Sequence, residues 1–206
     1  MPPVFIWFGP IKCNLLFSKK GIKYVISLPS IMLSTVGFLK LPDPSFKKMN
    51  LDLTDKTAIV CGATQGIGFA TAKELSSLGA RIVLVARNEE KLIEAAAQLH
   101  DQTKNHSYLV ADFSHPQQVS EAIQLFFQHD TSHILVNNTG GPNPGKAIES
   151  DIEQFRQAFN AHLICNQILA QACAPHFIQN GYGRIVNVIS TSVKQPLPNL
   201  GVSNTI

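Results

Sequence analysis

Three glycines stand close together in the segment CGATQGIGFA, at Gly62, Gly66 and Gly68. A glycine loop between a strand and a helix lets the backbone approach a pyrophosphate, and the helix then offers its free N–H groups and positive dipole to the phosphates. A tight turn followed by a closely packed helix also explains three glycines. Because an apolar run precedes the segment and a helical pattern follows it, we predict that it binds a dinucleotide.

Arg87 is a second residue with binding chemistry, and it follows the apolar run 81–86. A carboxylate at this place binds the 2′-hydroxyl of NAD, whereas an arginine accommodates the 2′-phosphate of NADP. The sequence has Ala86 where the acid would stand and Arg87 next to it. We therefore predict NADP as the cofactor, with NAD less favoured. The alternative is an exposed arginine without a binding role.

Short apolar runs alternate with helical patterns from residue 56 onward, and these elements must position both segments. We predict strands at 57–62, 81–86, 107–112, 133–138 and 183–190. Helices are predicted at 69–79, 88–100, 116–128 and about 151–177, with Asn88 and Pro116 beginning the second and third. Continuously apolar strands are buried on both faces, which requires helices on each side of a parallel sheet. The predicted fold class is α/β, a doubly wound parallel sheet of the Rossmann type.

The spacing Gly-x-x-x-Gly-x-Gly resembles that of the short-chain dehydrogenase/reductase family, and of its 3-oxoacyl-(acyl-carrier-protein) reductase-like members. Further motifs follow in the family's order: Asp112 after the third strand, NNTGG at 137–141, Asn160 in the next helix and Ser190 after the fifth strand. The resemblance extends from about Leu51 to the last residue. Each residue has an ordinary structural explanation, such as satisfying backbone groups at a strand end. Their order favours the functional interpretation.

The resemblance implies hydride transfer between a nicotinamide cofactor and a small-molecule carbonyl or alcohol substrate. The implied cofactor contacts are Gly62, Thr64, Gln65, Gly66, Ile67, Gly68, Arg87, Asp112, Phe113, Asn138 and Gly140. The implied catalytic residues are Asn160 and Ser190, and the Ser190 hydroxyl would hold the substrate oxygen. His162 is expected to be a surface or packing residue of the long helix, and Cys165 and Cys173 to pack in the core.

Ser203 stands where this family has its proton-donating tyrosine, thirteen residues after Ser190. An aliphatic hydroxyl is a far weaker acid than a phenol, whose pKa is about 10. The family's lysine would fall four residues later, beyond Ile206, together with the helix that forms the family's homo-oligomer interface and the last strands. Without those strands, the fifth strand would have an unpaired edge. Lys194 is either an alternative proton donor or a solvated loop lysine.

Three functions therefore stay open. The first is an NADP-dependent oxidoreductase of the short-chain dehydrogenase/reductase type. The second is a catalytically silent NADP-binding or interaction protein, because Ser203 replaces the tyrosine. The third is a truncated fragment without function.

Charge and cysteine content limit the other classes. Residues 1–48 carry seven lysines and one acid, whereas the rest of the chain carries ten basic and 13 acidic residues. The predicted domain thus has no basic stripe for nucleic acid. No histidines, cysteines or carboxylates stand at metal-ligand spacing, so we predict no metal site. Four cysteines without a CxxC pair favour a reducing compartment, and we predict a cytoplasmic location.

Residues 1–48 are predicted to be an extension outside the domain, and residues 49–206 to be the dinucleotide-binding domain. Between Lys23 and Lys40 lie sixteen uncharged residues interrupted by Pro29 and Gly37. This run is shorter than the roughly 20 residues of a spanning helix. Weak membrane-surface association and a targeting segment without a cleavage site are the alternatives. We predict no firm membrane association.

Overall fold

The computed structural model describes residues 5–8, 11–18, 21–26 and 50–206. The chain divides into two units, Met1–Asn50 and Leu51–Ile206. In the first unit, strands β1 (Phe5–Phe8), β2 (Ile11–Ser18) and β3 (Gly21–Ile26) form an antiparallel sheet of their own. Most of the apolar run after Lys23 lies outside the described residues. The assignment of residues 1–48 to an extension stays a prediction.

No helix among the described residues is long and apolar enough to cross a membrane.

The second unit contains a five-stranded parallel sheet, in the order β6-β5-β4-β7-β8. The strands are β4 (Thr57–Cys61), β5 (Arg81–Ala86), β6 (Ser107–Val110), β7 (Ile134–Asn137) and β8 (Arg184–Asn187). Every residue of the central strand β4 is buried, as expected for a strand covered on both faces. The predicted fold class is confirmed.

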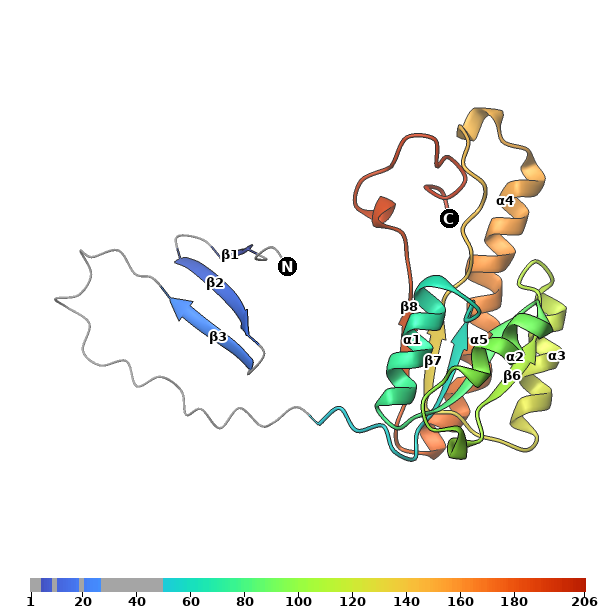
Figure 1. Ribbon diagram of the computed structural model, residues 1–206. Coiled ribbons are helices and arrows are strands. Elements are labelled where there is room, and N and C mark those ends of the chain that lie inside the picture. The colour runs from blue at the N-terminus through green and yellow to red at the C-terminus, as the bar shows by residue number, and fades with distance from the viewer. Residues whose placement is uncertain (1–4, 9–10, 19–20, 27–49) are drawn as a thin grey trace. The chain divides into compact units, whose positions relative to one another are not determined.

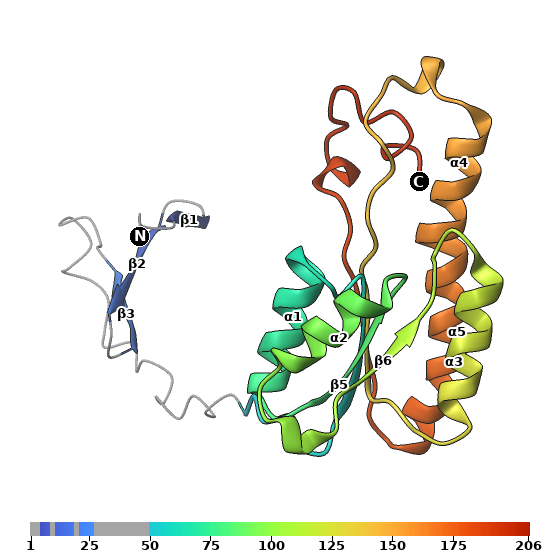
Figure 2. The ribbon, with the colours of Figure 1, turned by 45° about the vertical axis from the view of Figure 1, so that its right-hand side comes forward.

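Helices cover both faces of this sheet (Figures 1 and 2). Helices α1 (Gly66–Ser77) and α2 (Glu89–Ala97) pack on one face, through a cluster that includes Ala72 and Leu92. Helix α3 (Pro116–Phe127) packs on the other face, next to α5 (Cys165–Gln179). Asn88 caps α2 by accepting a hydrogen bond from the Lys91 N–H at 2.8 Å, and Pro116 begins α3.

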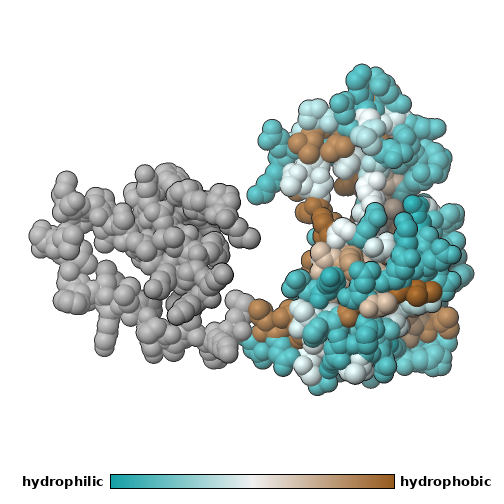
Figure 3. Space-filling model, viewed as in Figure 1, coloured by the Kyte–Doolittle hydropathy of each residue, from teal (hydrophilic) through white to brown (hydrophobic). Residues whose placement is uncertain are grey.

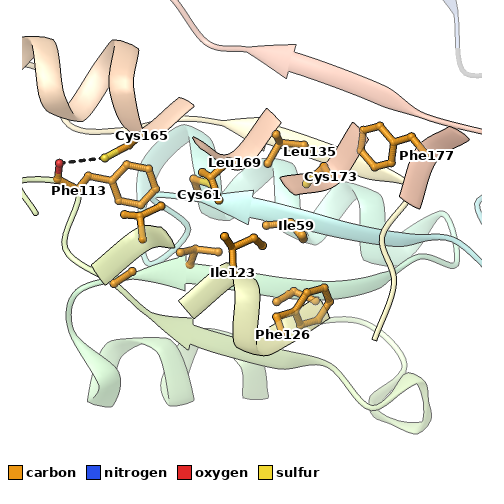
Figure 4. Close-up of a cluster of buried hydrophobic side chains, with 14 residues drawn as sticks. Ile59, Cys61, Phe113, Ile123, Phe126, Leu135, Cys165, Leu169, Cys173 and Phe177 are labelled. Atoms are coloured by element: carbon orange, nitrogen blue, oxygen red, sulfur yellow. Dashed lines mark hydrogen bonds between the residues drawn. The ribbon is translucent and has the colours of Figure 1, made fainter. Parts of the chain in front are cut away.

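The core on the α3 and α5 side is made of aliphatic, aromatic and cysteine side chains (Figure 4). Ile59 and Leu135 from the sheet meet Ile123 from α3 and Leu169 from α5, and all four side chains are inaccessible or nearly so. Burying each such side chain stabilises the fold by about 1.5–3 kcal/mol. Cys165 and Cys173 belong to the same cluster, so the expectation that they pack in the core is confirmed.

The long helical stretch predicted at about 151–177 is helical throughout, but the type of helix changes inside it. Helix α4 (Ile152–Phe159) begins with a capping box between Asp151 and Gln154, a π-helical segment follows at Asn160–Ile164, and α5 continues from Cys165. A π-helical turn contains one more residue than an α-helical turn, so the side chains after it face in a shifted direction. The predicted helical stretch is therefore present, and the π-helical turn inside it was not predicted.

Strand β8 lies at the edge of the described sheet, as expected for the fifth strand. All four of its residues are exposed, and Ile189 after it is 69% exposed. Apolar side chains accordingly reach the surface of this unit (Figure 3). The segment after β8 has a short 3-10 helix at Thr191–Val193 and is tied back by a bridge between Gly145 and Leu200.

Candidate functional site

The glycine loop follows β4 directly, and packing requires two of its three glycines, Gly62 and Gly68. A Cβ atom at Gly62 would lie 2.5 Å from the Asn138 carbonyl oxygen, and the backbone there has φ +57°. A Cβ atom at Gly68 would overlap the Gly62 carbonyl oxygen. Gly66 differs, because no atom lies within 4 Å of its Cβ position. The loop thus packs closely on the strand ends and leaves open space at Gly66.

Helix α1 begins at Gly66 without a capping side chain. Gln65 precedes the helix in extended conformation and makes no capping hydrogen bond from its side chain, and the first turn holds no acidic residue. The first backbone N–H groups of a helix have no partner within the helix and carry the positive end of its dipole. They suit an anionic group bound at the loop.

An open cavity of about 650 Å³ lies where the ends of β4, β5, β6 and β7 meet. Ten of the predicted cofactor contacts line it: Gly62, Thr64, Gln65, Gly66, Ile67, Arg87, Asp112, Phe113, Asn138 and Gly140. Gly68, the eleventh, is buried in α1 and packs against the loop. The cavity volume is within the range of natural ligand sites. The fold therefore brings segments from four strand ends to one place.

Asn138 joins the end of β7 to the glycine loop. Its Nδ2 donates hydrogen bonds to the carbonyl oxygens of Cys61 at 3.2 Å and Gly62 at 3.3 Å. The preceding Asn137 donates from Nδ2 to Oδ1 of Asn187 at 2.9 Å. The two asparagines thus hold neighbouring strand ends together, which is the structural role that the sequence also allowed for them.

The two charged side chains in the cavity lining, Asp112 and Arg87, differ in their contacts with the protein. The Asp112 carboxylate accepts a hydrogen bond from the Ser114 N–H at 2.9 Å, which orders the turn after β6. Arg87 is exposed, and within the part of the chain that the structure describes its guanidinium forms no hydrogen bond or ion pair. A cation without a protein partner is thus available to a ligand at the end of β5.

The three predicted catalytic residues do not line this cavity. Ser190 caps the 3-10 helix after β8, where its Oγ accepts hydrogen bonds from the Ser192 N–H at 3.1 Å and the Ser192 hydroxyl at 2.8 Å. Asn160 begins the π-helical segment and lines a smaller cavity with Phe159 and Ile206. Ser203 is half-buried in the C-terminal turns. Their catalytic roles stay predictions.

His162 is a cavity residue that the sequence analysis assigned to the helix surface or to packing. Its Nδ1 lies 2.9 Å from the Thr139 Oγ1, and both residues line the cavity. Burial lowers the pKa of the imidazole, and the Gly140 backbone acts in the opposite direction. The sequence feature that could have indicated this contact is Thr139, a polar residue at a position where the family that the sequence resembles usually has alanine.

A parallel sheet covered by helices, with a glycine loop and a cavity at its carboxyl edge, defines a Rossmann-type nucleotide-binding protein. The model of the short chain dehydrogenase family matches residues 56–202. The chain therefore belongs to the short chain dehydrogenase family.

Relatives of the chain include uncharacterized, reductase and inactive members. An uncharacterized oxidoreductase of Staphylococcus epidermidis is 35% identical over 142 residues, 69% of this chain and 61% of that protein. A 3-oxoacyl-(acyl-carrier-protein) reductase of Rickettsia bellii is 34% identical over 68% of this chain and 56% of its own length. The human inactive hydroxysteroid dehydrogenase-like protein 1 is 34% identical over 69% of this chain and 44% of its own length. The chain thus spans less than two thirds of these relatives.

Two solved structures have the same fold. The L-sorbose reductase of Gluconobacter frateurii, complexed with NADPH and L-sorbose, has a TM-score of 0.70 and 28% identity, covering 76% of this chain and 60% of that one. A gluconate 5-dehydrogenase of Burkholderia cenocepacia, in complex with NADP and tartrate, has a TM-score of 0.69 and 29% identity, covering 76% and 62%.

Proposed function

We propose that the cavity binds NADP and that the chain belongs to an oxidoreductase that transfers hydride between NADPH and a carbonyl or alcohol substrate. The observation that carries the proposal is the joint lining of one cavity by the glycine loop, Arg87, Asp112 and Asn138. The solved relatives that contain NADPH or NADP support it.

The residues present fit this cofactor. The open space at Gly66 and the uncapped start of α1 suit a diphosphate. Arg87 suits the 2′-phosphate, since a guanidinium binds phosphate through paired hydrogen bonds. We assign Asp112 and Phe113 to the part of the cavity that would hold the adenine of the cofactor. Asn138 and Gly140 line the rest of the cavity wall. When bound, NADPH supplies the hydride.

The chain has no phenol at the position of the family's proton donor. Ser203 replaces a phenol by an alcohol with a much higher pKa, and general acid catalysis typically contributes 10²–10⁴ in rate. The Ser190 Oγ accepts two hydrogen bonds from Ser192, which leaves its own O–H free to donate to a substrate oxygen. The replacement of the phenol at Ser203 favours a second candidate function, NADP binding without catalysis. The human relative described as inactive is consistent with it.

Titration of the whole chain with NADPH and NADH tests the binding proposal. We expect NADPH to bind more tightly, and Arg87→Ala to weaken NADPH binding by roughly 10-fold or more, as for the loss of a charged hydrogen bond. NADH binding should change little. Arg156→Ala is the matched control, because Arg156 is exposed on α4 and its one ion pair among the described residues is with Glu153 at 3.7 Å. Equal affinity for the two cofactors would remove Arg87 from the 2′-phosphate role.

Oxidation of NADPH in the presence of a panel of ketones and aldehydes separates the two candidate functions. The silent binder gives no turnover although it binds NADPH. Turnover that disappears in Ser190→Ala establishes the oxidoreductase. In that case another group donates the proton, and Lys194, which is exposed after the 3-10 helix, is the first residue to replace.

A further inference from the structure

Thr139 and His162 join two cavity walls that are far apart in the sequence. Thr139 follows Asn138 at the end of β7, and His162 is the central residue of the π-helical segment. The Thr139 Oγ1 and the His162 Nδ1 are 2.9 Å apart, and both residues line the cavity. The contact therefore connects the loop after β7 directly to the helical wall.

The π-helical segment makes this contact possible. Its extra residue shifts the direction of the side chains, and such segments are frequent at functional sites. Ala161 and His162 line the cavity, while Cys165 at the start of α5 is buried and donates from Sγ to the Phe113 carbonyl oxygen at 3.3 Å (Figure 4). His162 thus contacts the loop after β7, and Cys165, three residues later, holds the loop after β6.

The imidazole of His162 is suited to a fixed hydrogen-bonding role. It is half-buried, and burial lowers its pKa, so the ring is neutral at pH 7 with one donor and one acceptor nitrogen. The Gly140 backbone acts on this pKa in the opposite direction. The neutral ring contacts the Thr139 hydroxyl through Nδ1 at 2.9 Å.

Asn138 extends the connection from this pair to the glycine loop. Its Nδ2 bonds the carbonyl oxygens of Cys61 and Gly62, and it directly precedes Thr139. The position of the Asn138–Gly140 segment is thus fixed on one side by the glycine loop and on the other by His162.

We propose that His162 is a positioning residue, which sets the affinity of the cavity for the dinucleotide by holding the Asn138–Gly140 segment through Thr139. This inference rests on the proposed NADP binding. His162 acts through Thr139 and this segment, and its role needs the hydrogen bond rather than the bulk of the ring.

The test is a double-mutant cycle on NADPH affinity in the whole chain. Thr139→Val removes the hydroxyl at constant shape, and His162→Leu removes the ring nitrogens. Each should weaken NADPH binding roughly 3- to 10-fold, the effect of one net hydrogen bond. The double variant should bind about as weakly as either single variant, because both remove the same interaction. Thr139→Ser and His162→Gln keep hydrogen-bonding groups and should restore most of the affinity.

His129→Gln changes an exposed histidine before β7, outside the cavity lining, and should leave NADPH binding unaltered. Unchanged NADPH affinity in a folded Thr139→Val variant overturns the inference, and the proposed function stands. Full additivity of the two substitutions in the double variant also overturns the inference. If His162→Leu does not fold, the NADPH affinities of Thr139→Val and Thr139→Ser test the inference without it. If the wild-type chain does not bind NADPH, the proposed function fails, and the inference fails with it.

Discussion

At the scale of single residues, glycines and asparagines set the geometry of the site. Gly62 and Gly68 allow β4, the loop and α1 to approach more closely than side chains permit. Asn138 holds the glycine loop in place by donating hydrogen bonds to the Cys61 and Gly62 carbonyl groups. The cavity therefore depends on residues that are small or that satisfy the backbone.

Gly68→Ala is expected to destabilise the domain by about 1–3 kcal/mol, because the new Cβ forces the Gly62 carbonyl group to move. NADPH binding should be lost with it. Gly141→Ala is the matched control, since no atom lies within 4 Å of its Cβ position and it should be tolerated. Urea unfolding of both variants measures the difference. Equal stability of the two variants would show that the loop relaxes freely.

His133 gives a second prediction at this scale, on pH dependence. Its Nδ1 accepts a hydrogen bond from the Thr57 N–H at 3.1 Å, which requires the neutral ring, and burial followed by the charge of Lys56 lowers its pKa from 6.5. The unfolded state then binds the proton more readily. The contribution of His133 to stability is complete above pH 6.5 and is lost as pH falls through the lowered pKa of the folded state.

Urea unfolding between pH 7.5 and 5 measures this effect. His133→Gln should be less pH-sensitive than the wild type, and His129→Gln, at an exposed position, should behave as the wild type. A free energy of unfolding that rises on acidification would contradict the assignment.

At the scale of elements, the edge strand β8 differs from the rest of the sheet. Val136 in β7 and Val186 in β8 are register partners, yet Val136 is 2% and Val186 is 49% exposed. Ile189 adds to the exposed apolar surface. The two β-branched residues at the middle of β8, Ile185 and Val186, are both exposed, and an exposed apolar edge strand is a template for pairing with other chains.

Val186→Lys is therefore expected to reduce concentration-dependent light scattering of the chain, with a change in unfolding free energy within about 0.5 kcal/mol. Val136→Lys is the control, because it places an unpaired charge in the core and should unfold the domain. If Val186→Lys also unfolds the domain, another segment or chain covers β8 in solution.

At the scale of the whole molecule, both core clusters are built from residues after Leu51. The clusters contain residues of α1, α2, α3, α5 and the parallel sheet, and the family match begins at residue 56. The charge difference between the two parts of the chain follows the same division, with the lysine-rich segment at residues 1–48.

Deletion of residues 1–48 is expected to change the melting temperature by less than about 2 °C, since 1 kcal/mol corresponds to roughly 2–4 °C for a domain of this size. NADPH affinity should also be retained. Differential scanning fluorimetry of the full chain and of residues 49–206 tests the domain boundary. A decrease of several degrees would place part of the N-terminal segment in the folded domain.

The sequence by itself was sufficient to predict the fold class, the five parallel strands and the glycine loop. These depend on local patterns: continuous apolar runs for buried strands, helix signals at Asn88 and Pro116, and glycines where side chains do not fit. The same patterns, in order along the chain, indicated the family that the match to residues 56–202 establishes.

Only the tertiary structure decided which of these residues meet. Arg87 and Asn138 line one cavity because the strand order places β5 and β7 on either side of β4. The π-helical segment and the contact of Thr139 with His162 depend on packing between elements, which no local pattern encodes. Ser190 lies outside the cavity for the same reason, because its side chain is held by Ser192 beyond the end of β8.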